Sequence, residues 1–371
     1  MKLFTDSIHS VSSCCFFMQV TNAVNEGITA VLCTRQLDAE GFPRVPSLVG
    51  SLVRFGVTGT VAELLLSVPE QDVAPLREAF ESRRATLWSS GGRWHAPPCR
   101  GYLKLVMKRS FSVRVVGDSQ VLPSSRELLT SLTPAAERSS GGRGASYRMQ
   151  MLIKLGIARL VRTRHYLTFD SDVFAKRPFG IADLLIGSKA LIQGEMQDGG
   201  STQHRRSWWE AAARIFHAPG CVKGHTRAIG VTPALLVTAI ARNLTAMIER
   251  LWGQGRIPPV PWDALLFEQL RHTDWTEYTL YYTYACASGE ADRFHAVGAR
   301  RLYDANGFGW GAWQTMRHRL QHEFAGTGAI FGVVQSIGGA DPMEVSAALR
   351  PFIVPRADEY NASIRRRNAL R

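Results

Sequence analysis

The chain has no long hydrophobic run, although 45% of its 371 residues are hydrophobic. A helix that crosses a bilayer needs about 20 consecutive apolar residues, so we expect no transmembrane segment. The start of the chain is mildly apolar, but it carries Asp6 and His9 and lacks a convincing cleavage site for a signal peptide. We therefore favour a cytoplasmic or membrane-peripheral location over secretion.

The sequence has six cysteines, but it has no CxxC pair and no spacing typical of a zinc site. We expect buried free thiols rather than a disulfide scaffold. The sequence also lacks a nucleic-acid-binding module, although 44 Lys and Arg against 31 Asp and Glu give a net charge of +13. The basic residues are spread along the chain, so we interpret them as a solvated surface that attracts phosphates, and we expect no nucleic acid partner.

Short apolar runs and amphipathic segments alternate in the first half of the chain. Strands are predicted at 28–33, 64–68 and 112–116, with helices at 48–55 and 73–83 between them. This βαβαβ order predicts an α/β fold with a mainly parallel, doubly wound sheet.

The second half of the chain is more helical. A helix is predicted at 145–161, a second one starting at Thr232-Pro233, and a third one from Pro261 to Leu270. The aromatic run at 281–284 is typical of a strand packed in a sheet. A sugar-binding wall is the alternative interpretation of these tyrosines.

The most informative motif is Asp170-Ser171-Asp172, which follows the apolar stretch Tyr166–Phe169. A buried strand that ends in two acids brings both carboxylates to its carboxyl end, where ligands gather in open α/β sheets. Mg²⁺ and Mn²⁺ prefer oxygen ligands and keep open positions for water and substrate phosphates. The motif therefore predicts a divalent cation, Mn²⁺ or Mg²⁺, and a nucleotide substrate, whereas a solvated loop is the simpler alternative.

Other polar residues are expected near this pair of acids. Asp118 follows the predicted strand at 112–116, so it is expected at the same edge of the sheet. Gln150 and Lys154 lie on the stripe of the 145–161 helix that should pack inward. A buried lysine needs a partner, so Lys154 either extends along the rim of the core or reaches the acids or a diphosphate.

Several segments, taken in order, resemble glycosyltransferases of the GT-A fold, and more narrowly a group of glycosyltransferase-like proteins. The resemblance extends from Gly27 to about Ser336. The matching segments are Tyr147–Leu155, Tyr166–Asp172, Arg206–Trp209, Val231–Leu236, Pro261-Trp262 and Thr276–Tyr281.

This resemblance implies a domain organisation. Residues 1–26 would be an N-terminal extension and residues 341–371 a basic C-terminal tail. Residues 27–340 would form a single glycosyltransferase domain, with a nucleotide-binding half at 27–175 and an acceptor half at 176–340.

The resemblance also implies roles for the polar residues. Asp172 would bind the cation directly, and Asp170 would contact the ribose, or the metal through water. Lys154 would neutralise the donor phosphate, with Gln150 and Asp118 in the same donor site. A late histidine, His322 or His295, would be a further metal ligand.

The implied reaction moves a sugar from a nucleotide-diphosphate sugar to a hydroxyl of an unknown glycan, lipid or protein acceptor. A reaction that inverts the anomeric centre needs a carboxylate base, for which we choose Glu277, with Asp263 second. In a retaining reaction Glu277 would only orient the sugar.

Two other classes of protein are weighed against this hypothesis. A haloacid dehalogenase-type phosphohydrolase also uses Mg²⁺ and an Asp-x-Asp motif, but its motif takes Thr or Val where this chain has Phe174. A non-catalytic basic binding protein for nucleic acid or acidic lipid would not need the paired acids.

Overall fold

A computed structural model describes most of the chain from residue 27 onward. The described residues are 27–34, 44–57, 59–81, 111–124, 145–193, 195–196, 202–223, 227–228, 232–253, 259–270, 275–303, 317–318, 320–325, 328–334 and 342–353. The expected extension at 1–26 and the Ser-, Gly- and Arg-rich stretch at 125–144 lie outside them.

The fold is built around a five-stranded sheet in the order β10-β4-β1-β2-β3, in which only β10 is antiparallel to its neighbour. Smaller sheets join β11-β7-β6, β12-β5 and β8-β9. The strands are β1 (Ile28–Cys33), β2 (Val61–Val68), β3 (Ser112–Gly117), β4 (His165–Phe169), β5 (Val173–Ala175), β6 (Leu185–Ile186), β7 (Lys189–Ile192), β8 (Glu195–Met196), β9 (Arg227–Ala228), β10 (Ala234–Val237), β11 (His295–Val297) and β12 (Phe331–Val333).

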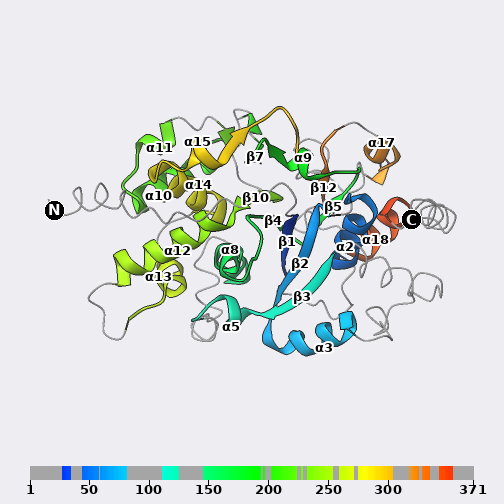
Figure 1. Cartoon of the computed structure of the whole chain (residues 1–371), viewed down its shortest axis with the longest axis horizontal. Coiled ribbons are helices and arrows are strands. Elements are labelled where there is room, and N and C mark those ends of the chain that lie inside the picture. The colour runs from blue at the N-terminus through cyan, green and yellow to red at the C-terminus, as the bar shows by residue number, and fades with distance from the viewer. Residues whose placement is uncertain are drawn as a thin grey trace.

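Helices cover both faces of the central sheet. Figure 1 shows α8 with α12, α13 and α14 on one side and α2 with α18 on the other. The helices are α2 (Arg44–Phe55), α3 (Glu70–Glu81), α5 (Asp118–Val121), α8 (Ala145–Gly156), the 3₁₀ turn η3 (Ile157–Arg159), α9 (Ile181–Leu184), α10 (Thr202–Ile215), α11 (Gly220–Lys223), α12 (Thr238–Gly253), α13 (Trp262–Leu270), α14 (Glu277–Ala287), α15 (Ala291–Phe294), α17 (Leu320–Ala325) and α18 (Pro342–Ile353).

The mainly parallel α/β sheet predicted from the sequence is confirmed. Every residue of β1 and β4 is buried, as expected for inner strands with helices on both faces. Along the chain, β2 and β3 are added in turn on one side of β1, and β4 then pairs with the other side of β1. The carboxyl ends of β1 and β4 therefore meet at a switch point of the topology, where open α/β sheets bind ligands.

The helix expected to start at Thr232-Pro233 begins later. Residues Ala234–Val237 form β10, which pairs antiparallel with β4, and α12 starts at Thr238. A four-residue apolar run is too short for its periodicity to distinguish a strand from the first turn of a helix.

The prediction of a strand around Tyr281–Tyr284 is also wrong, because these residues lie in α14. Thr276 caps this helix, since its side chain accepts a hydrogen bond from the Thr279 backbone N at 3.2 Å. Residues 277–283 are all buried, so the helix has no polar face whose periodicity could be read. The interpretation of the tyrosines as packing residues is confirmed for Tyr281 and Tyr282, which are buried in the core.

The expectation of free thiols holds for Cys33, which is buried and unpaired, but not for Cys221 and Cys286. These two cysteines form a disulfide between α11 and α14, with their Cα atoms 5.9 Å apart. Their separation of 65 residues gives no spacing signal. Disulfides are typical of proteins from oxidising compartments, which does not favour the expected cytoplasmic location.

The folded part of the chain extends beyond the expected boundary at residue 340. In α18 the side chains of Val345, Leu349 and Ile353 are buried, and Ser346 Oγ lies 3.1 Å from Ser47 Oγ in α2. This helix, which we assigned to the tail, therefore packs on the domain.

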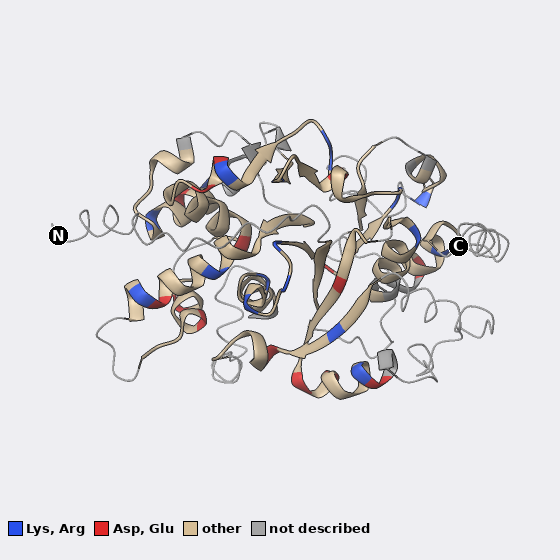
Figure 2. Cartoon of the chain, viewed as in Figure 1, with Lys and Arg blue, Asp and Glu red and all other residues tan. Residues whose placement is uncertain are grey.

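The described Lys and Arg residues are spread over several helices and strands (Figure 2). Some of them bind the backbone: Arg242 donates to the carbonyl oxygens of Ala158 and Val161, at 2.8 and 2.6 Å, and so holds the turn after α8. No helix among the described residues is long and apolar enough to cross a membrane.

Candidate functional site

The Asp170-Ser171-Asp172 motif forms a turn at the carboxyl end of β4. The Val173 N–H donates to the Asp170 carbonyl oxygen at 3.2 Å, and the Val334 N–H donates to the Asp172 carbonyl oxygen at 2.9 Å. Both aspartates are half-buried, and one carboxylate oxygen of Asp172 is shielded from solvent. The motif is therefore part of the packed domain and not of a solvated loop.

Three charged side chains meet beside this turn, and we call them the Lys154 cluster: Lys154, Asp170 and Glu277. The Lys154 Nζ atom lies 2.7 Å from Asp170 Oδ1 and 2.6 Å from Glu277 Oε1. Lys154 and Glu277 are each 3% exposed, whereas the Asp170 side chain is 35% exposed. Lys154 therefore contacts one acid of the motif from the protein interior, and the outer side of Asp170 faces solvent.

The helices and strands around the cluster fix the position of Lys154. The Lys154 ammonium lies 5.2 Å from the centre of the Tyr278 ring, a cation–π distance. The Tyr166 hydroxyl donates to the Lys154 carbonyl oxygen at 3.1 Å, and the Tyr278 hydroxyl lies 3.0 Å from Thr168 Oγ1. Residues from α8, β4 and α14 thus share one buried network.

Lys154 stays protonated in this environment. Burial by itself lowers the pKa of Lys154, but the carboxylates of Asp170 and Glu277 outweigh it, so the pKa lies well above the ordinary value. Lys154 is therefore a cation between two acids at physiological pH.

Asp118 and Cys33 lie at the same edge of the sheet. Cys33 ends β1 and Asp118 follows β3, where Ser67 Oγ donates to Asp118 Oδ1 at 3.2 Å. Burial raises the pKa of the Cys33 thiol, Lys154 opposes this rise, and Asp118, Asp170 and Glu277 add to it. Cys33 is therefore within electrostatic range of all four residues, although it was not among the predicted site residues.

Gln150 is half-buried on α8, one turn before Lys154. This spacing places both side chains on the same side of the helix, as the stripe in the sequence predicted. The expected contact of Gln150 with a sugar donor stays a prediction.

Asp263, the second choice for a base, lies in the interior with no exposed surface. Its Oδ2 atom accepts a hydrogen bond from the Ser124 backbone N at 2.8 Å, so it holds the segment after α5. Burial raises the pKa of Asp263, and the hydrogen bonds from Ser124 and Ala264 oppose this rise. This geometry is that of a structural acid.

The two candidate histidines lie on different elements. His322 is exposed on α17, whose Phe324 stacks on Phe174, two residues after Asp172, and on Phe352. Its role as a metal ligand stays a prediction. His295 is buried on β11, where Nε2 lies 3.0 Å from the Tyr281 hydroxyl. It is also within electrostatic range of His165, the first residue of β4, which is at the opposite end of that strand from Asp170. The structure therefore does not support His295 as a ligand beside Asp172.

The burial of His295 predicts a dependence of stability on pH. Burial, followed by repulsion from His165, lowers the pKa of His295 from 6.5 to about 3. Between these values the unfolded chain binds a proton and the folded chain does not, so acidification favours unfolding. We expect His295 to contribute a loss of about 2 kcal/mol in unfolding free energy between pH 7 and pH 5.

Urea denaturation of His295→Gln and of the unchanged protein at both pH values measures this contribution. The loss on acidification should be smaller in His295→Gln, whereas His322→Gln should keep the full loss because His322 is exposed. Equal losses in all three proteins would contradict the prediction.

Mg²⁺ and Mn²⁺ need oxygen ligands, and the turn has few of them. Among the described residues, no group of three or more His, Cys, Asp and Glu side chains could hold a metal ion. The turn carries the carboxylates of Asp170 and Asp172, and Lys154 contacts Asp170 Oδ1. Two carboxylates fit a hard cation that takes its remaining ligands from water and a substrate diphosphate.

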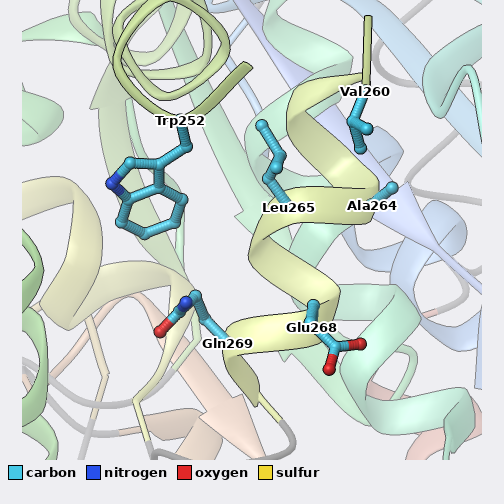
Figure 3. A pocket seen from close by; sticks show the side chains of 6 residues that line it. All are labelled: Trp252, Val260, Ala264, Leu265, Glu268 and Gln269. Atoms are coloured by element: carbon cyan, nitrogen blue, oxygen red, sulfur yellow. The ribbon is translucent and has the colours of Figure 1, made fainter. Parts of the chain in front are cut away.

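A hollow of about 250 Å³ lies elsewhere, between the end of α12 and α13. Figure 3 shows its lining, with the indole of Trp252 facing Leu265, and with Gln269 and Glu268 at the end of α13. None of the predicted site residues lines this hollow. It is therefore not the site to which the paired acids belong.

The residue that holds the turn was not selected from the sequence. The Thr232 side-chain oxygen accepts from the Asp170 backbone N at 3.0 Å and donates to the Thr168 carbonyl oxygen at 3.1 Å. The sequence placed Thr232 at the start of a helix, and the only signal for its role was its position in a segment of the resemblance.

These features define an α/β protein with a charged site at the switch point of its sheet. The model of DUF6492, a family of unknown function, matches residues 101–356, and the chain belongs to this family. The matched region contains the Lys154 cluster, the Asp170-Ser171-Asp172 turn and α18.

The chain also resembles solved structures at low identity, whereas no curated protein matches it. It is similar to the apo form of mouse xyloside xylosyltransferase 1, at 11% identity and a TM-score of 0.41 over 85% of this chain and 100% of that chain. It is also similar to the apo structure of WbbM, a bifunctional glycosyltransferase, at 9% identity and a TM-score of 0.41 over 93% of this chain. The chain spans 53% of the length of WbbM.

Proposed function

We propose that this protein is a metal-dependent glycosyltransferase that moves a sugar from a nucleotide-diphosphate sugar to an acceptor hydroxyl. The observation that carries this proposal is the pair of acids at the switch point of the sheet. Asp170 and Asp172 lie in one turn at the carboxyl end of β4. Lys154 contacts Asp170 Oδ1 from the interior, and the outer side of Asp170 faces solvent.

Two carboxylates in one half-buried turn favour the binding of a hard cation. Asp172 and the outer oxygen of Asp170 would hold a divalent cation, which when bound stabilises the negative charge of a diphosphate. Hard cations of this kind usually combine one or two carboxylates with substrate phosphates. The site thus fits a substrate that brings its own diphosphate.

In the proposed reaction the bond between the anomeric carbon and the diphosphate oxygen breaks, and a bond from the acceptor oxygen to that carbon forms. The proton of the acceptor hydroxyl leaves to a base, and the electron pair of the broken bond stays on the diphosphate. Lys154 holds Asp170 in place, and Glu277 holds Lys154. The base role of Glu277 stays a prediction, because its carboxylate is buried and paired with Lys154.

The test is a thermal-shift screen of nucleotide sugars with and without Mn²⁺. A donor present at 100 times its Kd should stabilise the folded protein by about 2.7 kcal/mol, and it should do so only with Mn²⁺ present. Asp172→Ala should lose the shift, whereas Asp183→Ala should keep it, since Asp183 is also half-buried but pairs with Arg177.

Two results would contradict the proposal. One is a shift that survives Asp172→Ala, and the other is hydrolysis of a generic aryl phosphate by the purified protein without any response to nucleotide sugars. The second result would favour the phosphohydrolase instead.

A further inference from the structure

Thr232 lies at the place where β4 leaves the sheet. In the antiparallel pair of β10 and β4, Ala234 is opposite Thr168. Extending this register by two residues along each strand places Thr232 opposite Asp170. A regular ladder would pair these two residues through their backbones, and the described ladder ends before them.

The Thr232 side chain replaces the missing ladder contacts. One oxygen atom, Oγ1, accepts from the Asp170 N–H at 3.0 Å and donates to the Thr168 carbonyl at 3.1 Å. Only a hydroxyl can do both with a single atom. The residue is 4% exposed, so water is a poor substitute, and a buried N–H without an acceptor is costly.

We propose that Thr232 is a positioning residue that orients the carboxylates of Asp170 and Asp172 for a divalent cation. This inference rests on the function proposed above. Fixing the Asp170 backbone directs one carboxylate oxygen to Lys154 Nζ at 2.7 Å and leaves the other toward solvent. The same bond sets the start of the turn that carries Asp172, whose carbonyl accepts from Val334 at the far end.

The chain offers a matched control at the other end of the same strand pair. The Thr238 hydroxyl donates to the Thr163 carbonyl at 2.8 Å, and Thr238 is 5% exposed. Thr238 follows β10, whereas Thr232 precedes this strand. Thr238 lies beside the start of β4 and not beside the paired acids. A valine at either position removes a buried hydroxyl without a large change in side-chain volume.

The experiment measures Mn²⁺ affinity by isothermal titration calorimetry and melting temperature in EDTA for the unchanged protein and four variants. We expect Thr232→Val and Thr232→Ala to weaken Mn²⁺ binding by about tenfold or more. The reason is that the hydrogen bond to the Asp170 N–H, which orients the carboxylates, is lost, and one hydrogen bond corresponds to about a tenfold change in an equilibrium constant. Thr232→Ser keeps the hydroxyl and should bind within about twofold of the unchanged protein. Thr238→Val should lower the melting temperature but leave the Mn²⁺ affinity unchanged.

Unaltered Mn²⁺ affinity in a folded Thr232→Val or Thr232→Ala variant overturns the inference, and so does an equal loss of affinity in Thr238→Val. The alanine variant adds no bulk, so it keeps the test open if the valine variant does not fold. If the unchanged protein itself does not bind Mn²⁺, the proposed function fails first and the role of Thr232 fails with it.

Discussion

Lys154→Met is expected to lower the free energy of unfolding by about 3–5 kcal/mol, the cost of removing one partner from a buried ion pair. The substitution keeps the length and much of the volume of the side chain but removes its charge. It leaves Glu277, 3% exposed, and the inner oxygen of Asp170 without the ammonium that lies 2.6 and 2.7 Å away. Urea denaturation at pH 7 measures the loss.

Lys189→Met is the matched control for this loss. Lys189 is half-buried and its ammonium binds a backbone carbonyl in an exposed contact, so its loss should change stability by less than about 0.5 kcal/mol. The double variant Lys154→Met/Glu277→Gln should lose less unfolding free energy than the sum of the losses in the two single variants. The reason is that the double variant has no unpaired carboxylate at position 277. A coupling energy of about 0.5–3 kcal/mol is expected for contacting residues, and additive losses would show that the cluster does not act as a unit.

The strands that form the centre of the sheet could be predicted from the sequence because their apolar runs are complete. The run at 28–33 matches β1, and the run before Asp170 matches β4 apart from His165. Burial on both faces makes such strands continuous in hydrophobicity. The position of Asp170 and Asp172 at the end of a buried strand followed from this directly.

Lys154 could be selected because helical spacing placed a charge on an inward stripe, but its partner Glu277 could not be deduced from the pattern. The two residues are 123 positions apart, and their contact depends on how α14 packs on α8. Neither α14 nor β10 has a clear hydrophobic period in the sequence, because residues 277–283 of α14 are all buried and β10 has only four residues. Thr232 was missed for the same reason, because its role follows from the register of β10.

Asp172→Asn is expected to lower the rate of sugar transfer by about 10³-fold. The loss of rate follows from removing a charged ligand of the cation that stabilises the leaving diphosphate, an electrostatic contribution of about 3–4 kcal/mol in comparable sites. The substitution keeps the size of the side chain and the Asp172 backbone carbonyl, which accepts from the Val334 N–H at 2.9 Å, so the turn itself should keep its conformation.

Melting temperatures in EDTA and in saturating Mn²⁺ show whether Asp172→Asn acts through the cation. The unchanged protein should melt higher in Mn²⁺ than in EDTA, because it gains stability from binding, and Asp172→Asn should lose most of this gain. Asp183→Asn should keep the gain, since the Asp183 carboxylate pairs with Arg177 and accepts from the Gly180 N–H. An Asp172→Asn variant that gains as much from Mn²⁺ as the unchanged protein would mean that Asp172 is not a ligand of the cation, and a loss of transfer rate in that variant would then need another cause.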